Sequence, residues 1–153
     1  MYRLLFSILL FGTINTEPIK INLVTTNDIH GMIAPQKANF MNPQYPPTIL
    51  GGAAFSKYVD ELRKEVNNNG EGLLILDGGN IFQGNPLGIA DGGLTMIEWM
   101  NRIGYDAMVP GSYDFISGAQ NLNTLSEAAS FPFLFSNLIC TNCPLISSNI
   151  KPY

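Results

Sequence analysis

Charged side chains are scarce in this sequence, and none of its segments is a basic run. Charged residues make up 13% of the 153 residues, whereas hydrophobic residues make up 46%. This composition excludes an acidic or basic disordered tail, because such segments lack the apolar surface that offsets chain entropy. Eight Lys and Arg residues against twelve Asp and Glu residues give a net charge of −4. Binding of nucleic acid through phosphate neutralisation is therefore not expected.

Several common site signatures are also missing. His30 is the single histidine, so this chain by itself cannot supply two imidazoles to one site. The sequence has no G-x-x-x-x-G-K-[ST] motif, no G-x-G-x-x-G motif after its first expected strand, and no G-x-S-x-G motif. It therefore lacks the signatures of a P-loop, of a dinucleotide-binding fold and of a serine nucleophile elbow.

No apolar run is long enough to cross a bilayer. The run Leu4–Phe11 follows Arg3 and is followed by the more polar Thr13–Thr16. A cationic start, a short apolar core and a polar exit are typical of a secretory signal peptide, although a buried first strand is the alternative. We expect residues 1–17 to be a signal peptide and the chain to be exported to the periplasm, the cell surface or the medium.

Four β-rich stretches follow along the chain. Ile19–Thr26 alternates apolar and polar residues and ends in the polar loop Asn27–Gly31. Leu73–Leu76 is wholly apolar, as expected for a strand that is covered on both faces, and it ends in Asp77–Asn80. Third and fourth strands are predicted near 107–109 and 133–135.

Helical stripes alternate with these strands. They consist of Phe55, Tyr58, Val59, Leu62 and Val66; of Met96, Trp99, Met100 and Ile103; and of Leu122, Leu125 and Ala129. The connection between the first strand and the first helix contains Pro35, Pro43, Pro46 and Pro47, which predict an irregular segment.

This alternation predicts βαβ units, a parallel sheet and an α/β fold. Loops that leave the carboxyl ends of parallel strands gather along one edge, where ligands bind. The candidate residues on those loops are Asp28, His30, Asp77, Asn80, Ser112, Tyr113 and Asp114.

Two of these loops carry donors at spacings that suit a cation. Asp28 and His30 place a carboxylate and an imidazole on the same side of an extended stretch, so both can reach one metal ion. The alternative is an aspartate that caps a turn beside a surface histidine. Asp77 and Asn80 flank two glycines that let the backbone approach a ligand, or that only form a tight turn.

Taken together, these loops resemble successive blocks of a known family. The blocks are T-N-D-I-H-G at 26–31, G-G-A-A at 51–54, L-D-G-G-N-I-F-Q-G-N-P at 76–86, P-G-S-Y-D-F at 110–115 and F-L-F-S-N-L at 133–138. In order and spacing they are similar to the secreted 5′-nucleotidases, which are calcineurin-like metallophosphatases. The resemblance implies that residues 18–153 form the N-terminal portion of a metallophosphatase domain. It also implies an exported hydrolase of phosphoric monoesters, with nucleotides or related phosphate esters as substrates.

The resemblance further implies a divalent metal site, with two ions such as Zn²⁺ or Mn²⁺. It assigns Asp28 and His30 to the first metal ion. Asn80 stands where the family has a bridging aspartate, Ser112 where it has an asparagine ligand, and Tyr113 where it has a catalytic histidine. Tyr113 can donate a hydrogen bond to phosphate but carries no positive charge near pH 7. The remaining candidates are two carboxylates that would compensate for these departures, Asp77 as a metal ligand and Asp114 as a catalytic group.

These departures leave a second function open, which is a catalytically degenerate ligand-binding protein or an inactive fragment. The family's further metal-binding histidines lie beyond the equivalent of residue 153. We therefore expect the chain to be truncated and its partner to be the missing C-terminal part of the same protein.

Cys140 and Cys143 form a lone C-x-x-C motif, which is ambiguous in an exported chain. A local disulfide is favoured. Half of a metal site that other residues complete, and the redox motif of a thiol–disulfide protein, are the alternatives.

Overall fold

The computed structural model describes residues 18–136 and 150–151. The expected signal peptide at 1–17 and the cysteine pair Cys140 and Cys143 lie outside these residues. Within the described ranges no helix is long and apolar enough to cross a membrane.

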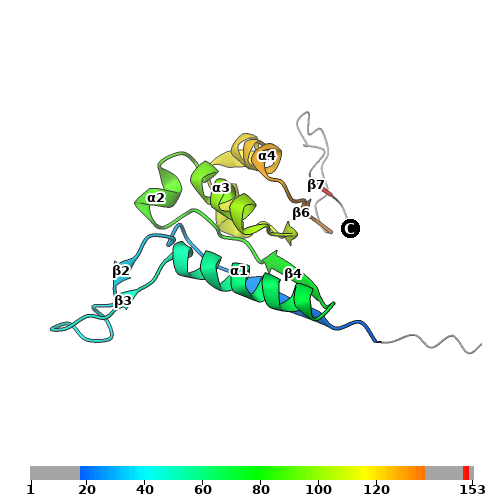
Figure 1. Cartoon of the computed structure of the whole chain (residues 1–153). Coiled ribbons are helices and arrows are strands. Elements are labelled where there is room, and N and C mark those ends of the chain that lie inside the picture. The colour runs from blue at the N-terminus through cyan, green and yellow to red at the C-terminus, as the bar shows by residue number, and fades with distance from the viewer. Residues whose placement is uncertain (1–17, 137–149, 152–153) are drawn as a thin grey trace, which may run out of the picture.

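The main sheet has five parallel strands, and the helices lie beside it (Figure 1). Its strands, in spatial order, are β1 (Ile21–Thr26), β4 (Gly72–Asp77), β5 (Ala107–Met108), β6 (Phe133–Leu134) and β7 (Ile150–Lys151). The helices between them are α1 (Gly52–Asn68), α2 (Pro86–Ile89), α3 (Leu94–Ile103), the 3₁₀ helix η1 (Ser112–Phe115) and α4 (Gly118–Ala128). The predicted α/β architecture with a parallel sheet is confirmed.

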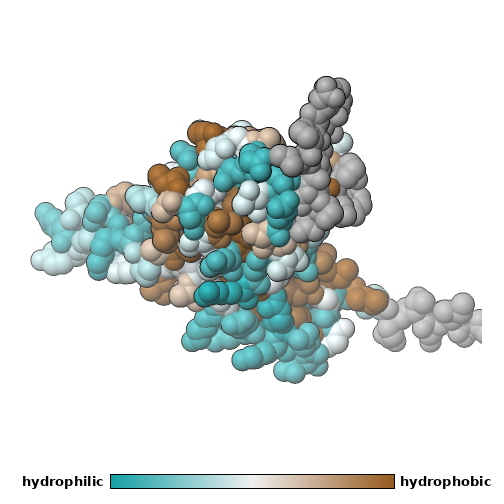
Figure 2. All heavy atoms as spheres, turned by 90° about the horizontal axis from the view of Figure 1, so that it is seen from above, coloured by the Kyte–Doolittle hydropathy of each residue, from teal (hydrophilic) through white to brown (hydrophobic). Residues whose placement is uncertain are grey.

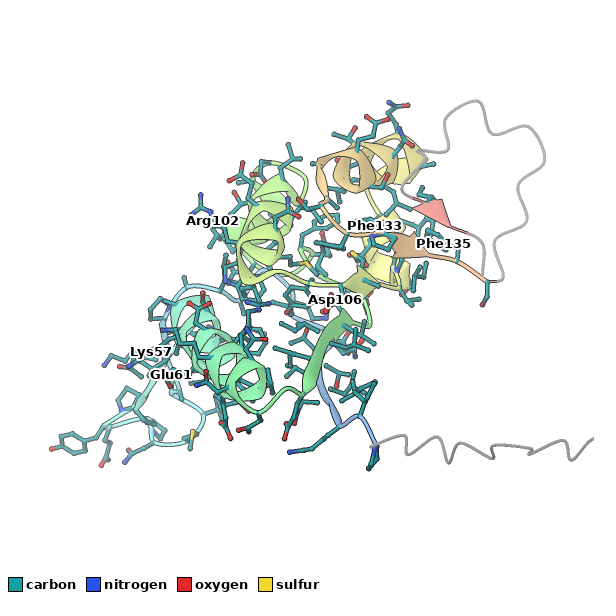
Figure 3. The ribbon with its side chains drawn as sticks, turned by 45° about the vertical axis from the view of Figure 1, so that its right-hand side comes forward. Lys57, Glu61, Arg102, Asp106, Phe133 and Phe135 are labelled. Carbon is teal, nitrogen blue, oxygen red and sulfur yellow. The ribbon has the colours of Figure 1, made fainter. Side chains whose placement is uncertain are left out.

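The amphipathic stripes explain where α1 and α3 begin, end and pack. Met96, Met100 and Ile103 of α3 are buried, and the helix ends at Gly104, whose φ of 80° suits glycine. Helix α1 buries Val59 and Val66. On its outer side Lys57 and Glu61, which are labelled in Figure 3, form an i, i+4 ion pair of 3.7 Å.

Tyr58 corrects one detail of the predicted stripe on α1. Its side chain is 56% exposed, whereas the neighbouring Val59 is fully buried. Phe55 and Trp99, by contrast, pack against the core, with their ring centroids 5.9 Å apart. Tyr58 thus lies at the margin of the stripe, where a phenol can keep its polar end in water.

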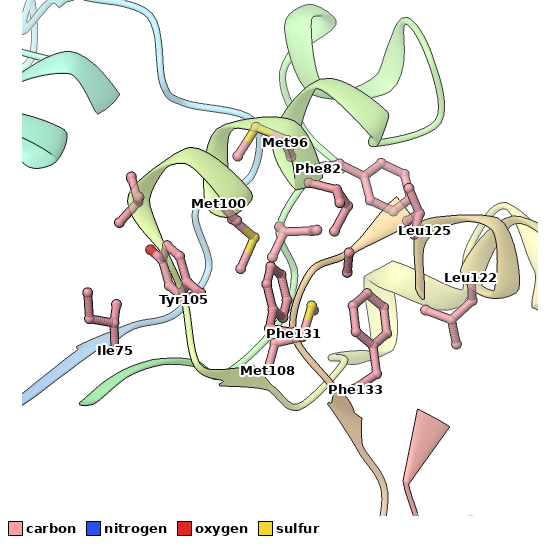
Figure 4. Packing of buried hydrophobic residues seen from close by; sticks show 14 of the residues in the cluster. Ile75, Phe82, Met96, Met100, Tyr105, Met108, Leu122, Leu125, Phe131 and Phe133 are labelled. Carbon is pink, nitrogen blue, oxygen red and sulfur yellow. The ribbon is translucent and has the colours of Figure 1, made fainter. Parts of the chain in front are cut away.

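The hydrophobic core lies between one face of the sheet and helices α1, α3 and α4 (Figure 4). The strand register places Asp77 opposite Met108, and Met108 opposite Phe133, so these side chains share that face. The core residues labelled in Figure 4 come from strands, helices and the loops between them: Ile75, Phe82, Met96, Met100, Tyr105, Met108, Leu122, Leu125, Phe131 and Phe133.

The opposite face of the sheet is apolar but exposed within the described residues. Ile21 is 60% exposed, and Leu23 and Leu74, which are paired across β1 and β4, are 59% and 40% exposed. Apolar surface also gathers beside the start of the described chain (Figure 2). The prediction that 73–76 is covered on both faces is therefore wrong for the described part of the chain, because the helices pack on one side only.

Several short elements were not predicted. The proline-containing connection includes an antiparallel hairpin of β2 (Gln36–Lys37) and β3 (Thr48–Ile49). The carbonyl of Pro47 accepts a hydrogen bond from the Ala38 N–H at 2.9 Å. Proline has no N–H, so it can take part in such pairing only as an acceptor. Helix α2 begins at Pro86, after the Asn85 side chain caps the Leu87 N–H at 3.0 Å. Strand β7 adds a fifth strand to the four that were expected.

Replacement of one isoleucine on each face tests this one-sided packing. Ile75→Ala should lower the free energy of unfolding by about 2–5 kcal/mol, because it leaves a cavity under the helices. Ile21→Ala should cost less than about 1 kcal/mol, because its side chain is already exposed. Urea unfolding of both variants measures the difference, and equal losses would contradict the assignment of the core to one face.

Candidate functional site

The loops after β1 and β4 run side by side at the carboxyl edge of the sheet. Asp28 N–H donates to the Gly79 carbonyl at 3.0 Å, His30 N–H to the Asn80 carbonyl at 3.0 Å, and Gly31 N–H to the Ile81 carbonyl at 2.7 Å. These bonds continue the pairing of the two strands into their loops. The structure thus brings the first two candidate loops together, as their position after parallel strands predicts.

Three of the candidate side chains meet at this edge. The Asn80 amide Nδ2 donates to Asp28 Oδ1 at 2.7 Å, and His30 Nε2 lies 3.6 Å from the same oxygen. His30 Nδ1 lies 2.5 Å from the carbonyl oxygen of Gln83. Because a carbonyl only accepts, Nδ1 carries a proton, and Nε2 is the ring nitrogen that faces Asp28.

The same three residues have left-handed backbone conformations. Asp28, His30 and Asn80 have φ values of 55°, 51° and 60°, and within the described residues they are the only non-glycine residues with positive φ. Such conformations cost roughly 1 kcal/mol or more for residues with a side chain, and they concentrate at functional sites. Their convergence here marks this edge as the candidate site.

The loop after β5 closes the site from the other side. The Tyr113 N–H donates to Asn80 Oδ1 at 2.9 Å, and the rings of Tyr113 and His30 meet edge to face at a centroid distance of 5.7 Å. Ser112 is exposed and begins η1 directly before Tyr113. A Cβ on Gly111 would lie 2.3 Å from Asn80 Oδ1, so glycine is needed for this approach.

Asp114 lies beneath the loops and holds them together. Its side chain is fully buried. It accepts hydrogen bonds from the backbone N–H groups of Asn80 at 2.7 Å, Ile81 at 2.9 Å and Gly111 at 2.8 Å. In this arrangement both carboxylate oxygens are used by the backbone. Its bond from the Gly111 N–H has the geometry of one half of a capping box, in which the side chain at the third helical position reaches back to the N–H before the helix.

Asp77 is the second buried carboxylate near the site. It accepts from Thr26 Oγ1 at 2.5 Å and from the Gly79 N–H at 2.7 Å, and Thr26 also bonds to the Tyr105 hydroxyl at 2.9 Å. Burial raises the pKa of Asp77 to about 6, against an ordinary value of 3.8. Burial likewise raises the pKa of Tyr105 to about 12. Sequence reasoning missed Thr26 and Tyr105, because no local pattern records contacts between residues this far apart in the chain.

The fit of these residues to metal ions can be judged from their geometry. Two donors on one tetrahedral cation at about 2.0–2.2 Å lie about 3.3–3.6 Å apart, which matches the 3.6 Å between His30 Nε2 and Asp28 Oδ1. Among the described residues, no group of three or more His, Cys, Asp or Glu is placed to hold a metal ion. Among the described residues, Asp28 and His30 therefore supply two of the ligands that a cation needs.

Comparison with known proteins shows which sequences and structures the chain is similar to. No family model matches the chain. The chain is 37% identical to Protein UshA of Salmonella pullorum over 119 residues. This match covers 78% of the present chain and 20% of UshA. The chain is 31% identical over 139 residues to the 5′-nucleotidase of Rattus norvegicus, covering 88% of this chain and 23% of the relative. The crystal structure of the 5′-nucleotidase precursor from Thermus thermophilus superimposes with a TM-score of 0.73 at 27% identity, over 86% of this chain and 25% of that one.

Over the stretch that it shares with them, the chain is similar in sequence and fold to the 5′-nucleotidases. It spans about a fifth of the length of the curated relatives it matches. The family resemblance predicted from the sequence blocks is thereby confirmed. The role of each site residue in this 5′-nucleotidase relative stays a prediction.

The raised pKa of Asp77 makes stability depend on pH. Its folded-state pKa of about 6 lies above the ordinary 3.8, so the folded state binds more protons and stability falls as pH rises from about 4 to about 6. This group alone contributes a fall of about 3 kcal/mol, from about 1.4 kcal/mol per pKa unit. In Asp77→Asn the fall should be absent. Urea unfolding of both proteins across this window measures it, and parallel pH profiles would contradict it.

Proposed function

We propose that this chain carries part of the active site of a metal-dependent phosphoric monoester hydrolase of the 5′-nucleotidase type. Its substrates would be nucleotides or related phosphate esters. The observation that supports this most is the convergence of Asp28, His30 and Asn80, all in left-handed conformations, at the carboxyl edge of the sheet. The relatives named 5′-nucleotidase support the substrate class.

Each residue of the site has a distinct part in this proposal. Asp28 Oδ1 and His30 Nε2 would hold a divalent cation such as Mn²⁺ or Zn²⁺, which polarises a phosphoryl oxygen and acidifies bound water. The Gln83 carbonyl fixes the ring of His30 so that Nε2 stays available. Tyr113, which is 48% exposed beside His30, would donate a hydrogen bond from its hydroxyl to a phosphate oxygen.

Ser112, Asp77 and Asp114 take supporting parts. The exposed Ser112 begins η1 and is a weak oxygen donor at the rim. Asp77 and Asp114 are 4% and 0% exposed, and backbone or hydroxyl groups occupy their oxygens. Their geometry favours a role in positioning the loops over the metal-ligand and catalytic roles predicted from the sequence.

The second candidate function is ligand binding without turnover. One observation favours it directly, because Asn80 presents an N–H donor, and not an oxygen, to Asp28. Tyr113 adds to it, since a phenol brings no positive charge to a phosphoryl group near neutral pH. Such a protein would keep the loops at the carboxyl edge of the sheet and their hydrogen-bond donors, but it would release no phosphate.

We also propose that the protein acts after export and that further polypeptide packs on the exposed sheet face. The signal-like pattern of residues 1–17 supports export. Ile21, Leu23 and Leu74 form a contiguous apolar surface on β1 and β4, and an exposed patch of this kind marks a packing or interaction surface. The matched stretch is only 20% of the length of the UshA relative, so that protein contains the material that such a cover needs.

The first experiment measures phosphate release from AMP by the full-length protein with Mn²⁺ or Zn²⁺. We expect release that Asp28→Ala and His30→Ala each reduce at least about 100-fold, because each removes one of two cation ligands. Asp60→Ala, on the exposed side of α1, serves as the charge-matched control and should leave the rate unchanged.

The outcome of this assay separates the two functions. Absence of phosphate release with every metal ion tested would contradict the hydrolase. If calorimetric titration of the same sample then showed AMP binding without consumption, the binding protein would be supported.

The second experiment probes the exposed sheet face in the 153-residue chain. Replacing Leu23 and Leu74 together by Thr should lower the fluorescence of the hydrophobic dye ANS while far-UV circular dichroism stays the same, because threonine is favourable in strands and removes apolar surface. Ile89→Thr, an exposed residue of α2, is the control. Unchanged dye binding in the double variant would show that this face is already covered.

A further inference from the structure

We infer that Asn80 is a positioning residue that holds Asp28 for a single divalent cation, and that it does not ligate a second one. This inference rests on the proposed function, whose cation site it describes more closely. It departs from the two-ion site that the sequence resemblance implies.

The orientation of the Asn80 amide is fixed by the groups on either side of it. The Tyr113 N–H can only donate, so the atom 2.9 Å from it must be the carbonyl oxygen Oδ1. The other end of the amide is therefore Nδ2, and it points at Asp28 Oδ1 at 2.7 Å. Turning the amide over would set an N–H against the Tyr113 N–H and two oxygens against each other. Asn80 thus has no free oxygen directed at Asp28.

The backbone of Asn80 is equally constrained. Its N–H donates to the buried Asp114 at 2.7 Å, and its carbonyl accepts from His30 N–H at 3.0 Å. With φ at 60°, the residue lies in the left-handed region, which asparagine tolerates better than most residues with a side chain. The amide is therefore built into the loops as a bridge between Asp28 and η1.

One oxygen of Asp28 serves both the amide and the cation. Oδ1 has two lone pairs, of which one accepts from Asn80 Nδ2 and the other is left for a cation shared with His30 Nε2, 3.6 Å away. Oδ2 accepts from Asn27 Nδ2 at 2.5 Å. Hydrogen bonds from outer residues to a ligating carboxylate orient it, and their loss typically weakens metal binding about 10–100-fold.

The experiment measures cation binding directly in the full-length protein, with Mn²⁺ and Co²⁺ as probes. Equilibrium dialysis should give one Mn²⁺ per chain, and His30→Gln should abolish binding. Asn80→Gly removes the side chain but tolerates positive φ, so it should bind Co²⁺ about 10–100-fold more weakly. At saturating Co²⁺ its visible absorption bands should match those of the unaltered protein, because no ligand is lost. Asn69→Gly, at the opposite end of the sheet, is the control.

A second variant keeps the test sharp if Asn80→Gly does not fold. Asn80→Asp retains an acceptor for Tyr113 N–H and turns the donor into a carboxylate oxygen. It should tighten Co²⁺ binding and shift the absorption bands, because a ligand is gained. Two Mn²⁺ per unaltered chain, no Mn²⁺ at all, or an altered Co²⁺ spectrum in Asn80→Gly would each overturn the inference. Phosphate release from AMP tests the hydrolase separately, so either proposal can fail without the other.

Discussion

The buried carboxylate of Asp114 is the contact on which the candidate site depends. It accepts three backbone N–H groups, from Asn80, Ile81 and Gly111, and so joins the loop after β4 to the loop after β5. An ionised acceptor makes stronger hydrogen bonds than a neutral one, and an unpaired N–H inside the protein would be costly. This single side chain therefore fixes where the Asn80 amide lies and, through it, where Asp28 and Tyr113 lie.

The site is built in two layers with different chemistry. The upper layer holds Asp28, His30 and Asn80 in strained backbone conformations at the rim. The lower layer contains two buried carboxylates. Asp77 accepts hydrogen bonds from Thr26 and Gly79, and Asp114 accepts hydrogen bonds from the backbone of two loops. Strained conformations persist only where their surroundings over-determine them. The buried carboxylates and the paired loops provide that constraint, and they leave the rim donors free to meet a ligand.

Among the described residues, one face of the sheet is covered by helices and the other is exposed. Helices α1, α3 and α4 bury the face that carries Ile75, Met108 and Phe133. The face of Ile21, Leu23 and Leu74 stays exposed among the described residues. This asymmetry agrees with a chain that spans about a fifth of its curated relatives.

Sequence alone determined the order of four strands of the sheet and of the three longer helices, because the alternation of residues 21–26 and the stripes of α1 and α3 are local periodicities that burial enforces. It also placed Asp28, His30 and Asn80 on one edge, since parallel strands end on the same side. The direction in which the Asn80 amide points, the burial of Asp114 and the contact of Thr26 with Tyr105 were decided by tertiary structure. Each joins residues more than 30 positions apart, and no local pattern records which of two polar groups donates or how much water reaches a carboxylate.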